Sequence, residues 1–314
     1  MRGLVLALVA LALPVLARAD EPPPPDWSKD IETVVVTASQ RGPLMWRVSK
    51  GGSTVVLLGV VGPVPEGLPW NTAGVSDALK GARQLLLNAQ ASVGLVEGLW
   101  YLTWHSDTVY LPDGTALESV LPETLRRRFV AAREKIHRDA DRYSSLRPPL
   151  AAMRLEGDFL DAVKLSRTEP SKTVERLARR MGIGAKPVAN YEALPMLRVL
   201  PSLSASANEA CVKDALDDLD SVQAHAAAGA QAWAVGDLDG IKANYSDERF
   251  QSCIQAMPGA AALFARAVRD SIAAVNAALA APGKTVMIVS IGALLKKDGI
   301  LDKLKGEGLE IEGP

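Results

Sequence analysis

The chain has 314 residues, of which 48% are apolar, and its 35 basic and 36 acidic side chains give a formal net charge of −1. This length and apolar content suffice for the core of one large domain or of two intimately packed domains. Because the lysines and arginines are scattered and balanced by acids, the chain is unsuited to binding a polyanion, and we expect no nucleic-acid partner.

The first 19 residues have the pattern of a cleaved signal peptide. Arg2 precedes an apolar stretch from Leu4 to Leu16, and Ala17-Arg18-Ala19 has the small-x-small form that signal peptidase cuts. A membrane anchor is the alternative, but the stretch is shorter than the roughly 20 residues that span a bilayer. We therefore expect cleavage after Ala19, a periplasmic or secreted chain beginning at Asp20, and no stable membrane insertion after cleavage.

Residues 20–43 are predicted to be a flexible arm. The proline run Pro22–Pro25 is followed by a polar stretch whose one β-like patch is Val34–Val36. Such a composition is typical of a tether that is mostly disordered. The globular pattern, and with it the predicted domain of residues 44–314, begins after this arm.

The start of the domain predicts two strands, a helix and a third strand. The apolar runs 44–50 and 53–61 flank Gly51-Gly52, which is a hairpin signal. Asn71 or Thr72 can cap a helix that runs to about Ala82. The run "RQLLLNAQ", residues 83–90, then reads as a short apolar strand.

Residues from about 112 to 280 are predicted to form a large helical insert. Pro122 and Pro148 stand at helix starts, and apolar residues after Pro122 recur at a spacing of three and four. Within the insert, a helix, a glycine stop and a short strand at 187–189 form an αβ unit. The chain then closes with a strand in 284–292, a helix in 298–305 and a strand in 309–313, so that strands at both ends enclose the insert.

Cys211 and Cys253 are the only cysteines, and a lone pair in an exported chain predicts a structural disulfide. Their spacing and the absence of histidine partners argue against zinc, and no Cys-x-x-Cys pair points to redox catalysis. In the chain-entropy model the loop they close stabilises the fold by roughly 4 kcal/mol.

The histidines predict no metal site, and no motif predicts a cofactor. His105, His137 and His225 are the only histidines, and none has the spacing of a zinc ligand pair. The chain also lacks a Gly-x-Ser-x-Gly elbow and a phosphate-binding loop, since "MGIGAKP" follows a helix rather than opening one. We therefore expect the histidines to lie on the surface. Nucleophilic catalysis would lack a general base.

Six segments of the chain resemble, in order, those of the TraB/GumN family, which is similar to the Tiki proteases and more distantly to the erythromycin-esterase and ChaN-like proteins. The resemblance runs from about residue 44 to 311. It implies an α/β fold with a central mixed sheet and helices on both faces. The segments are "LMWRVSKGGSTVVLLGVVGPVPEGLPW", "LPDGTALESVLPETLRRR", "LRPPLAAMRL", "AKPVANYEAL", "AWAVGDLDGI" and "TVMIVSIGALLKKDGILDKLK".

The resemblance also implies where a metal site would lie. In the family, the first core strand ends in Gly-x-x-His, the next carries Leu-Glu-x-Asp, and the last ends in Gly-x-Gly-His-Leu. Here Gly59 begins the first motif and Gly62 takes its histidine position. Asn88 and Gln90 take the positions of the glutamate and aspartate, and Ala293 takes that of the second histidine. The ligands that the family would supply are therefore absent, and we expect no bound metal.

Some polar positions of the family pattern are retained. Glu192 matches a family glutamate, and Arg269 matches the arginine of an Arg-Asn segment whose asparagine is Asp270 here. A salt bridge that ties the insert to the sheet is one interpretation, and a contact to a ligand is the other. Trp233 also matches, but it continues an apolar stripe at helical spacing and is expected in the core.

These observations give one hypothesis and two alternatives. The hypothesis is a catalytically inactive family member, exported to the periplasm of a Gram-negative bacterium, whose strand-end pocket binds an unknown small ligand or an envelope protein. One alternative is a hydrolase with a relocated site that uses Glu192, Arg269 and Asp270. The other is a scaffold without a pocket, associated with the export of envelope polysaccharide.

Overall fold

The computed structural model describes residues 42–245, 253–254 and 257–314, which all fall in the unit Val34–Pro314. The predicted signal peptide, residues 1–19, and all but the last two residues of the predicted arm, 20–43, lie outside the described residues. Within the ranges that are described, no helix is both long enough and apolar enough to cross a membrane.

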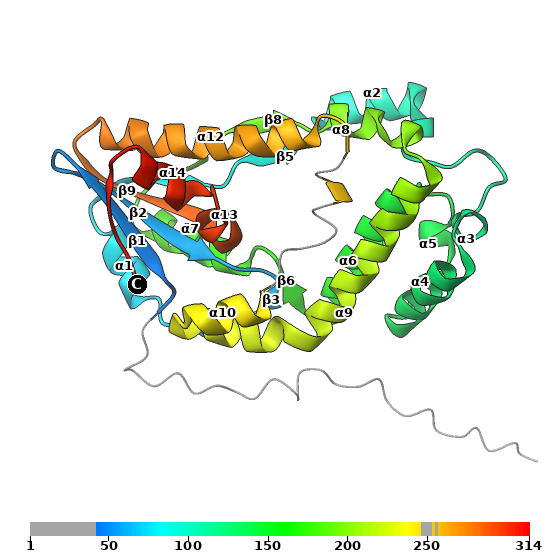
Figure 1. Cartoon of the computed structure of the whole chain (residues 1–314), viewed down its shortest axis with the longest axis horizontal. Helices are drawn as coiled ribbons and strands as arrows, with labels where there is room; N and C mark the ends of the chain where they lie inside the picture. The colour runs from blue at the N-terminus through cyan, green and yellow to red at the C-terminus, as the bar shows by residue number, and fades with distance from the viewer. Residues whose placement is uncertain (1–41, 246–252, 255–256) are drawn as a thin grey trace, which may run out of the picture. The chain divides into compact units, whose positions relative to one another are not determined.

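A six-stranded mixed sheet forms the centre of the fold, with the strand order β10-β1-β2-β9-β4-β7 (Figure 1). Strand β1 runs antiparallel to both β2 and β10, whereas β2, β9, β4 and β7 are parallel to one another. The predicted α/β class with a mixed sheet is therefore confirmed. The strands are β1 (Met45–Lys50), β2 (Ser53–Val60), β4 (Ala82–Leu87), β7 (Ala185–Pro187), β9 (Gly283–Ser290) and β10 (Glu310–Glu312).

The predicted hairpin joins β1 and β2. Gly51 and Gly52 have φ angles of 53° and 80°, a left-handed pair that two glycines adopt without steric cost. The turn sets Lys50 opposite Ser53 and Met45 opposite Leu58. This register aligns β2 so that its apolar run lies beside β9 over the full length of both strands.

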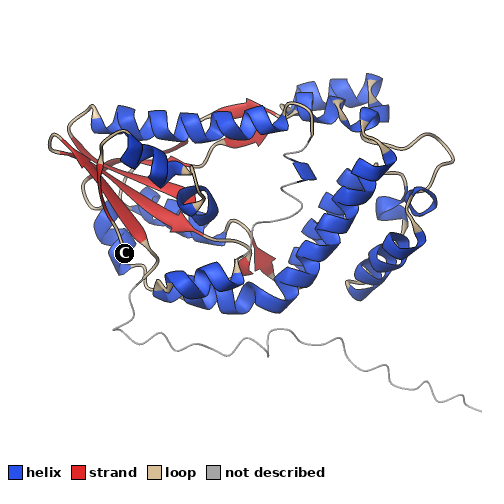
Figure 2. Cartoon of the chain, in the orientation of Figure 1, coloured by secondary structure: helices blue, strands red, loops and turns tan. Residues whose placement is uncertain are grey.

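Helices cover both faces of the sheet, as Figures 1 and 2 show. Helices α1 (Ala73–Leu79) and α7 (Glu169–Arg180) touch each other and β4, while α12 (Ala260–Leu279) and α13 (Ile291–Leu295) touch β2. Helix α14 (Ile300–Gly306) packs on α12. Because β2 and β9 are buried on both faces, their sequences are nearly continuous apolar runs rather than alternating ones.

A second group of helices packs around α9 (Ala205–Val235), which has 31 residues. Helices α4 (Glu123–Lys135) and α6 (Pro148–Ala162) contact α9 and each other over a core of their own. The segment expected to be a helical insert also supplies β7 to the main sheet. The remaining described elements are β3 (Val64–Pro65), β5 (Gln90–Ser92), β6 (Leu165–Ser166), β8 (Asn190–Glu192), α2 (Leu95–Trp104), η1 (Ser106–Thr108), α3 (Leu117–Val120), α5 (Asp141–Ser144), α8 (Leu194–Arg198), η2 (Leu200–Ser202) and α10 (Leu238–Asn244).

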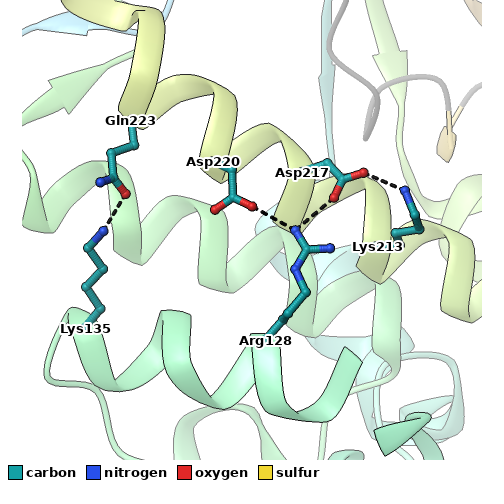
Figure 3. Close-up of polar contacts among 6 residues, drawn as sticks. All are labelled: Arg128, Lys135, Lys213, Asp217, Asp220 and Gln223. Atoms are coloured by element: carbon teal, nitrogen blue, oxygen red, sulfur yellow. Dashed lines mark hydrogen bonds and ion pairs between the residues drawn. The ribbon is translucent and has the colours of Figure 1, made fainter. Parts of the chain in front are cut away.

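Polar contacts hold α4 against α9 (Figure 3). Arg128 donates to Asp217 at 2.8 Å and to Asp220 at 2.9 Å, so one guanidinium bridges two successive turns of α9. Lys213 on α9 also contacts Asp217, at 2.6 Å. Lys135, near the end of α4, donates to Gln223. Although burial opposes the shift, the hydrogen bonds from Lys213 and Arg128 lower the pKa of Asp217.

The two cysteines lie close together in this second core. Cys211 and Cys253 are buried, with their Cα atoms 5.3 Å apart and their sulfur atoms within disulfide-bonding distance. The structure therefore confirms that the two cysteines lie at disulfide-bonding distance, as predicted. Since 42 positions of sequence separate the two residues, the bond ties α9 to the chain that leads into α12.

A buried carboxylate crosslinks α5 and α6. Asp158 of α6 is 5% exposed and accepts hydrogen bonds from the Arg142 guanidinium and from the Tyr143 hydroxyl, the latter at 2.7 Å. The hydrogen bonds from Arg142 lower the pKa of Asp158 against the opposing effect of burial. The folded state therefore favours the charged form of this carboxyl group.

Replacing this carboxylate should destabilise the fold in a pH-dependent way. We expect Asp158→Asn to lower the free energy of unfolding by about 2 kcal/mol at neutral pH, since Arg142 loses its charged partner. Because the folded pKa is depressed, this contribution is complete above the unfolded value of about 3.9 and is lost as the pH falls through the folded value. Denaturant titrations between neutral and acid pH measure it.

The matched control is Asp161→Asn, at an exposed position of the same helix. This variant should stay within about 0.5 kcal/mol of the natural protein. Equal effects of the two substitutions, or an Asp158→Asn effect that does not change with pH, would contradict this role of Asp158.

Candidate strand-end binding site

The carboxyl ends of β4 and β9 open into a cavity of about 640 Å³, called here the strand-end cavity. Asn88 follows β4, Ala293 lies in α13 directly after β9, and both line the cavity. Ligands of open α/β sheets bind in crevices at the carboxyl ends of strands. Two of the positions that the family resemblance assigns to metal ligands therefore come together in one space.

A break in β4 places Asn88 at this cavity. Strands β4 and β7 pair as far as Leu87, whose carbonyl accepts from the Val188 amide at 3.0 Å. Pairing resumes after a gap of two residues as β5 with β8, where the Gln90 amide donates to the Ala189 carbonyl at 2.9 Å. The predicted strand 83–90 is thus interrupted at Asn88 and Ala89, which line the cavity, whereas Gln90 is exposed beyond the break.

Gly62 does not lie at the strand-end cavity. It lines a separate space of about 40 Å³ with Pro63, Arg167 and Tyr245, whose hydroxyl donates to the Pro63 carbonyl at 3.1 Å. A Cβ atom on Gly62 would lie 2.9 Å from the Arg167 carbonyl oxygen and 3.1 Å from the Arg167 Cα atom. This position, which the family resemblance aligns with the first histidine, therefore has no room for a side chain.

The carboxyl end of β2, at Gly59, is covered by packed side chains. The indole N–H of Trp233, which is fully buried, donates to the Gly59 carbonyl at 2.8 Å. A Cβ atom on Gly59 would lie 2.9 Å from the Trp46 ring and 3.4 Å from Ile291. Trp70 packs edge-on against Trp233, with ring centroids 5.2 Å apart. Aromatic packing thus fills the end of this strand, and Trp233 is a core residue, as expected.

Of the three retained polar residues, only Arg269 lines the strand-end cavity. Asp270 accepts from the Tyr191 hydroxyl at 2.6 Å and pairs with Arg266 at 3.5 Å, so it ties α12 to β8. Burial and this hydrogen bond raise the pKa of Tyr191 to about 12. Glu192, the next residue of β8, is exposed.

The family model for TraB/PrgY/gumN matches residues 44–313. The chain belongs to the TraB/PrgY/gumN family. This confirms the resemblance seen in the sequence. Searches of curated proteins and of solved structures gave no match to the chain.

The residues at the strand ends do not fit the metal that TraB/PrgY/gumN membership implies. A catalytic divalent site needs about three protein ligands. Among the described residues, no group of three histidine, cysteine, aspartate or glutamate side chains could hold a metal ion. The side chains of Gly62 and Ala293 carry no ligand atom, and that of Asn88 carries no charge. Asp298 is the one carboxylate among the described residues that line the strand-end cavity.

The cavity wall carries basic side chains that the sequence analysis did not single out. Arg269 comes from α12, Lys296 and Lys297 follow α13, and Lys303 comes from α14. In the sequence Arg269 lies 27 positions before Lys296 and 34 positions before Lys303, since Arg269 precedes β9 and the lysines follow it. The cluster of lysines is visible in the sequence run "LLKKDGILDKLK". The arginine joins them at the cavity only because α12 packs on α14.

Helix α2 carries an exposed apolar face that the sequence analysis also missed. Val96, Leu99, Trp100 and Trp104 are 81%, 62%, 63% and 70% exposed. Tyr101, by contrast, is buried and stacks under Arg198 of α8. None of these residues lines the strand-end cavity, so the apolar face is a separate surface of this TraB/PrgY/gumN chain.

Gly62→Ala should show that a side chain is not tolerated there. Because its Cβ atom meets backbone atoms of Arg167, we expect a loss of about 1–3 kcal/mol in the free energy of unfolding. Gly157→Ala is the matched control, since it lies in α6 with nothing within 4 Å of its Cβ position. There, alanine should stabilise the helix by up to about 1 kcal/mol. Denaturant titration measures both, and equal behaviour would contradict the steric account.

Proposed function

We propose that this chain is an exported, catalytically inactive member of its family that binds a small ligand in the strand-end cavity. The observation that carries the proposal is that Asn88 and Ala293 line one open cavity, whereas Gly62 lines a different space, where the Arg167 backbone leaves no room for a side chain. In this proposal the cavity at the strand ends is kept. The metal-binding side chains that the family resemblance implies are missing, and their three positions do not lie around one space. A volume of about 640 Å³ lies in the range of small-molecule sites.

The chemistry of the lining supports binding without catalysis. None of the described residues that line the cavity is a histidine, cysteine or glutamate, so no side chain there matches a usual general base apart from Asp298 and the lysines. Ser271 lines the cavity, but its hydroxyl donates to the Ala267 carbonyl of its own helix at 2.8 Å. A serine held in this way has no base to activate it.

The two alternative functions have less support. A relocated hydrolase needs Glu192, Arg269 and Asp270 around one substrate, but only Arg269 faces the cavity and Asp270 is engaged by Tyr191. A scaffold without a pocket needs a filled crevice, and the crevice is open. An envelope protein remains the alternative partner to a small ligand, and the exposed face of α2 is the surface that favours it.

If the protein is inactive, as proposed, added metal ions should not change its stability. The melting temperature of the natural protein should not change with millimolar manganese, cobalt or zinc, whereas a genuine micromolar site would gain about 4 kcal/mol. The comparison is the double variant Asn88→Glu with Ala293→His, which places two metal-ligand side chains in the same cavity. A melting temperature of the natural protein that rises with metal and falls with chelator would contradict the proposal.

We propose export to the periplasm on two grounds, which are the signal pattern of residues 1–19 and the pairing of Cys211 with Cys253. Mass spectrometry of protein from the periplasmic fraction should find an N-terminus at Asp20 and a mass lower by two hydrogens than that of the reduced chain. A retained residue 1–19 segment would contradict cleavage, and two free thiols would contradict the oxidising compartment.

A further inference from the structure

The strand-end cavity carries a concentration of positive charge. Arg269, Lys296, Lys297 and Lys303 line it, and among the described residues of its lining Asp298 is the single carboxylate. The chain as a whole has a formal net charge of −1, so the excess of cations here is local and not a property of the composition. A concave site lined by charges of one sign raises the local concentration of ligands of the opposite sign.

These basic side chains have no structural partners among the described residues. In the part of the chain that the structure describes, none of the four side chains forms an ion pair or hydrogen bond. The nearby acids have other partners. Asp302 accepts from the backbone N–H of Asp298 at 3.1 Å, and Glu307, beside Arg269 and Lys303 in an adjoining groove, accepts from Asn276 at 2.8 Å. The cations are therefore available to a ligand.

The residues at the ends of β4 and β9 add neutral polar groups to the lining of the cavity. Asn88 and Ser290 stand at the ends of β4 and β9, where they offer an amide N–H and a hydroxyl as donors. By the family resemblance, Asn88 takes the position of a glutamate. A carboxylate there would repel an anion, and the amide does not. The residues that remove the metal site thus also remove negative charge from the cavity.

An apolar wall completes the cavity. Phe264 and Val268 contribute from α12, and Ile300 contributes from the start of α14. A free inorganic anion would leave this surface in water, whereas a ligand with an apolar body would remove it from water, which is favourable. The lining therefore offers two kinds of contact, charged and apolar.

We propose that the strand-end cavity binds an amphiphilic organic anion, with a carboxylate or phosphate head group held by Lys296, Lys303 and Arg269 and an apolar body packed on Phe264 and Val268. This inference rests on the proposed function and names the class of its ligand. The head group and the body are both required, since the lining offers both charged and apolar side chains.

Calorimetric titration of the mature protein with four probes tests this class. The probes are octanoate, octyl phosphate, the neutral octanamide and inorganic phosphate. Octanoate or octyl phosphate should bind with a stoichiometry of one, at least tenfold more tightly than octanamide and than inorganic phosphate, and the stronger of the two identifies the head group. Raising the ionic strength from about 20 mM to about 300 mM should weaken binding several-fold.

Paired variants locate the binding. Lys296→Gln with Lys303→Gln removes two cavity charges and should weaken binding of the anionic probe at least tenfold. Lys172→Gln with Lys242→Gln removes the same charge from exposed positions on α7 and α10 and should leave binding unchanged.

Three outcomes would overturn the inference. Octanamide that binds as tightly as octanoate would leave an apolar pocket without charge selection, and equal effects of the two lysine pairs would mean nonspecific attraction. Absence of binding by both anionic amphiphiles at millimolar concentration would exclude the ligand class. None of these outcomes bears on the metal titration, so the proposed lack of catalysis stands or falls separately.

Discussion

The hydrogen bond from the Trp233 indole to the Gly59 carbonyl closes the carboxyl end of β2, and the arrangement of the site depends on this closure. A fully buried N–H and a strand-end carbonyl satisfy each other here, and Trp46 and Ile291 occupy the space where a side chain at Gly59 would lie. An unpaired buried donor or acceptor costs about 1–3 kcal/mol, so the pair fixes the end of α9 against the sheet. The chain after β2 then leads away to Gly62 and the Arg167 backbone.

This closure divides the strand ends into two environments. The end of β2 is packed with aromatic rings, whereas the ends of β4 and β9 face an open cavity between α12 and the α13–α14 segment. The metal site that the family resemblance implies would draw its ligands from all three strands. In this TraB/PrgY/gumN chain Gly62, which follows β2, lines a space other than the strand-end cavity, and the Arg167 backbone leaves no room for a side chain there.

Much of the fold could be predicted from the sequence because its signals are local. Gly51-Gly52 between two apolar runs specifies a hairpin through backbone sterics alone, and the lone cysteine pair specifies a crosslink. Helix α1 ends at Leu79, before the predicted Ala82, because Gly81 has a φ angle of 71°. Helix α2 escaped prediction since its apolar residues, such as Trp100 and Trp104, are exposed and do not mark a buried face.

The site was less predictable because it depends on tertiary contacts. Nothing near Gly62 in the sequence shows that Arg167 will lie against it, and the break of β4 at Asn88 is visible only in the pairing with β7. The charge of the cavity is also a tertiary property. Lysines counted as scattered along the chain gather with Arg269 once α14 packs on α12.

The central claim is that the strand ends now form a cationic binding cavity instead of a metal-dependent active site. Thiol labelling of Ala293→Cys in the oxidised protein tests it most directly, with Ala224→Cys at an exposed position of α9 as the reference. The ratio of the rates with anionic iodoacetate and neutral iodoacetamide reports the local potential, because the thiolate fraction cancels. The account predicts a ratio several-fold higher at position 293 that falls to the reference value at high salt. Equal ratios at low salt, or a lower ratio at position 293, would contradict it.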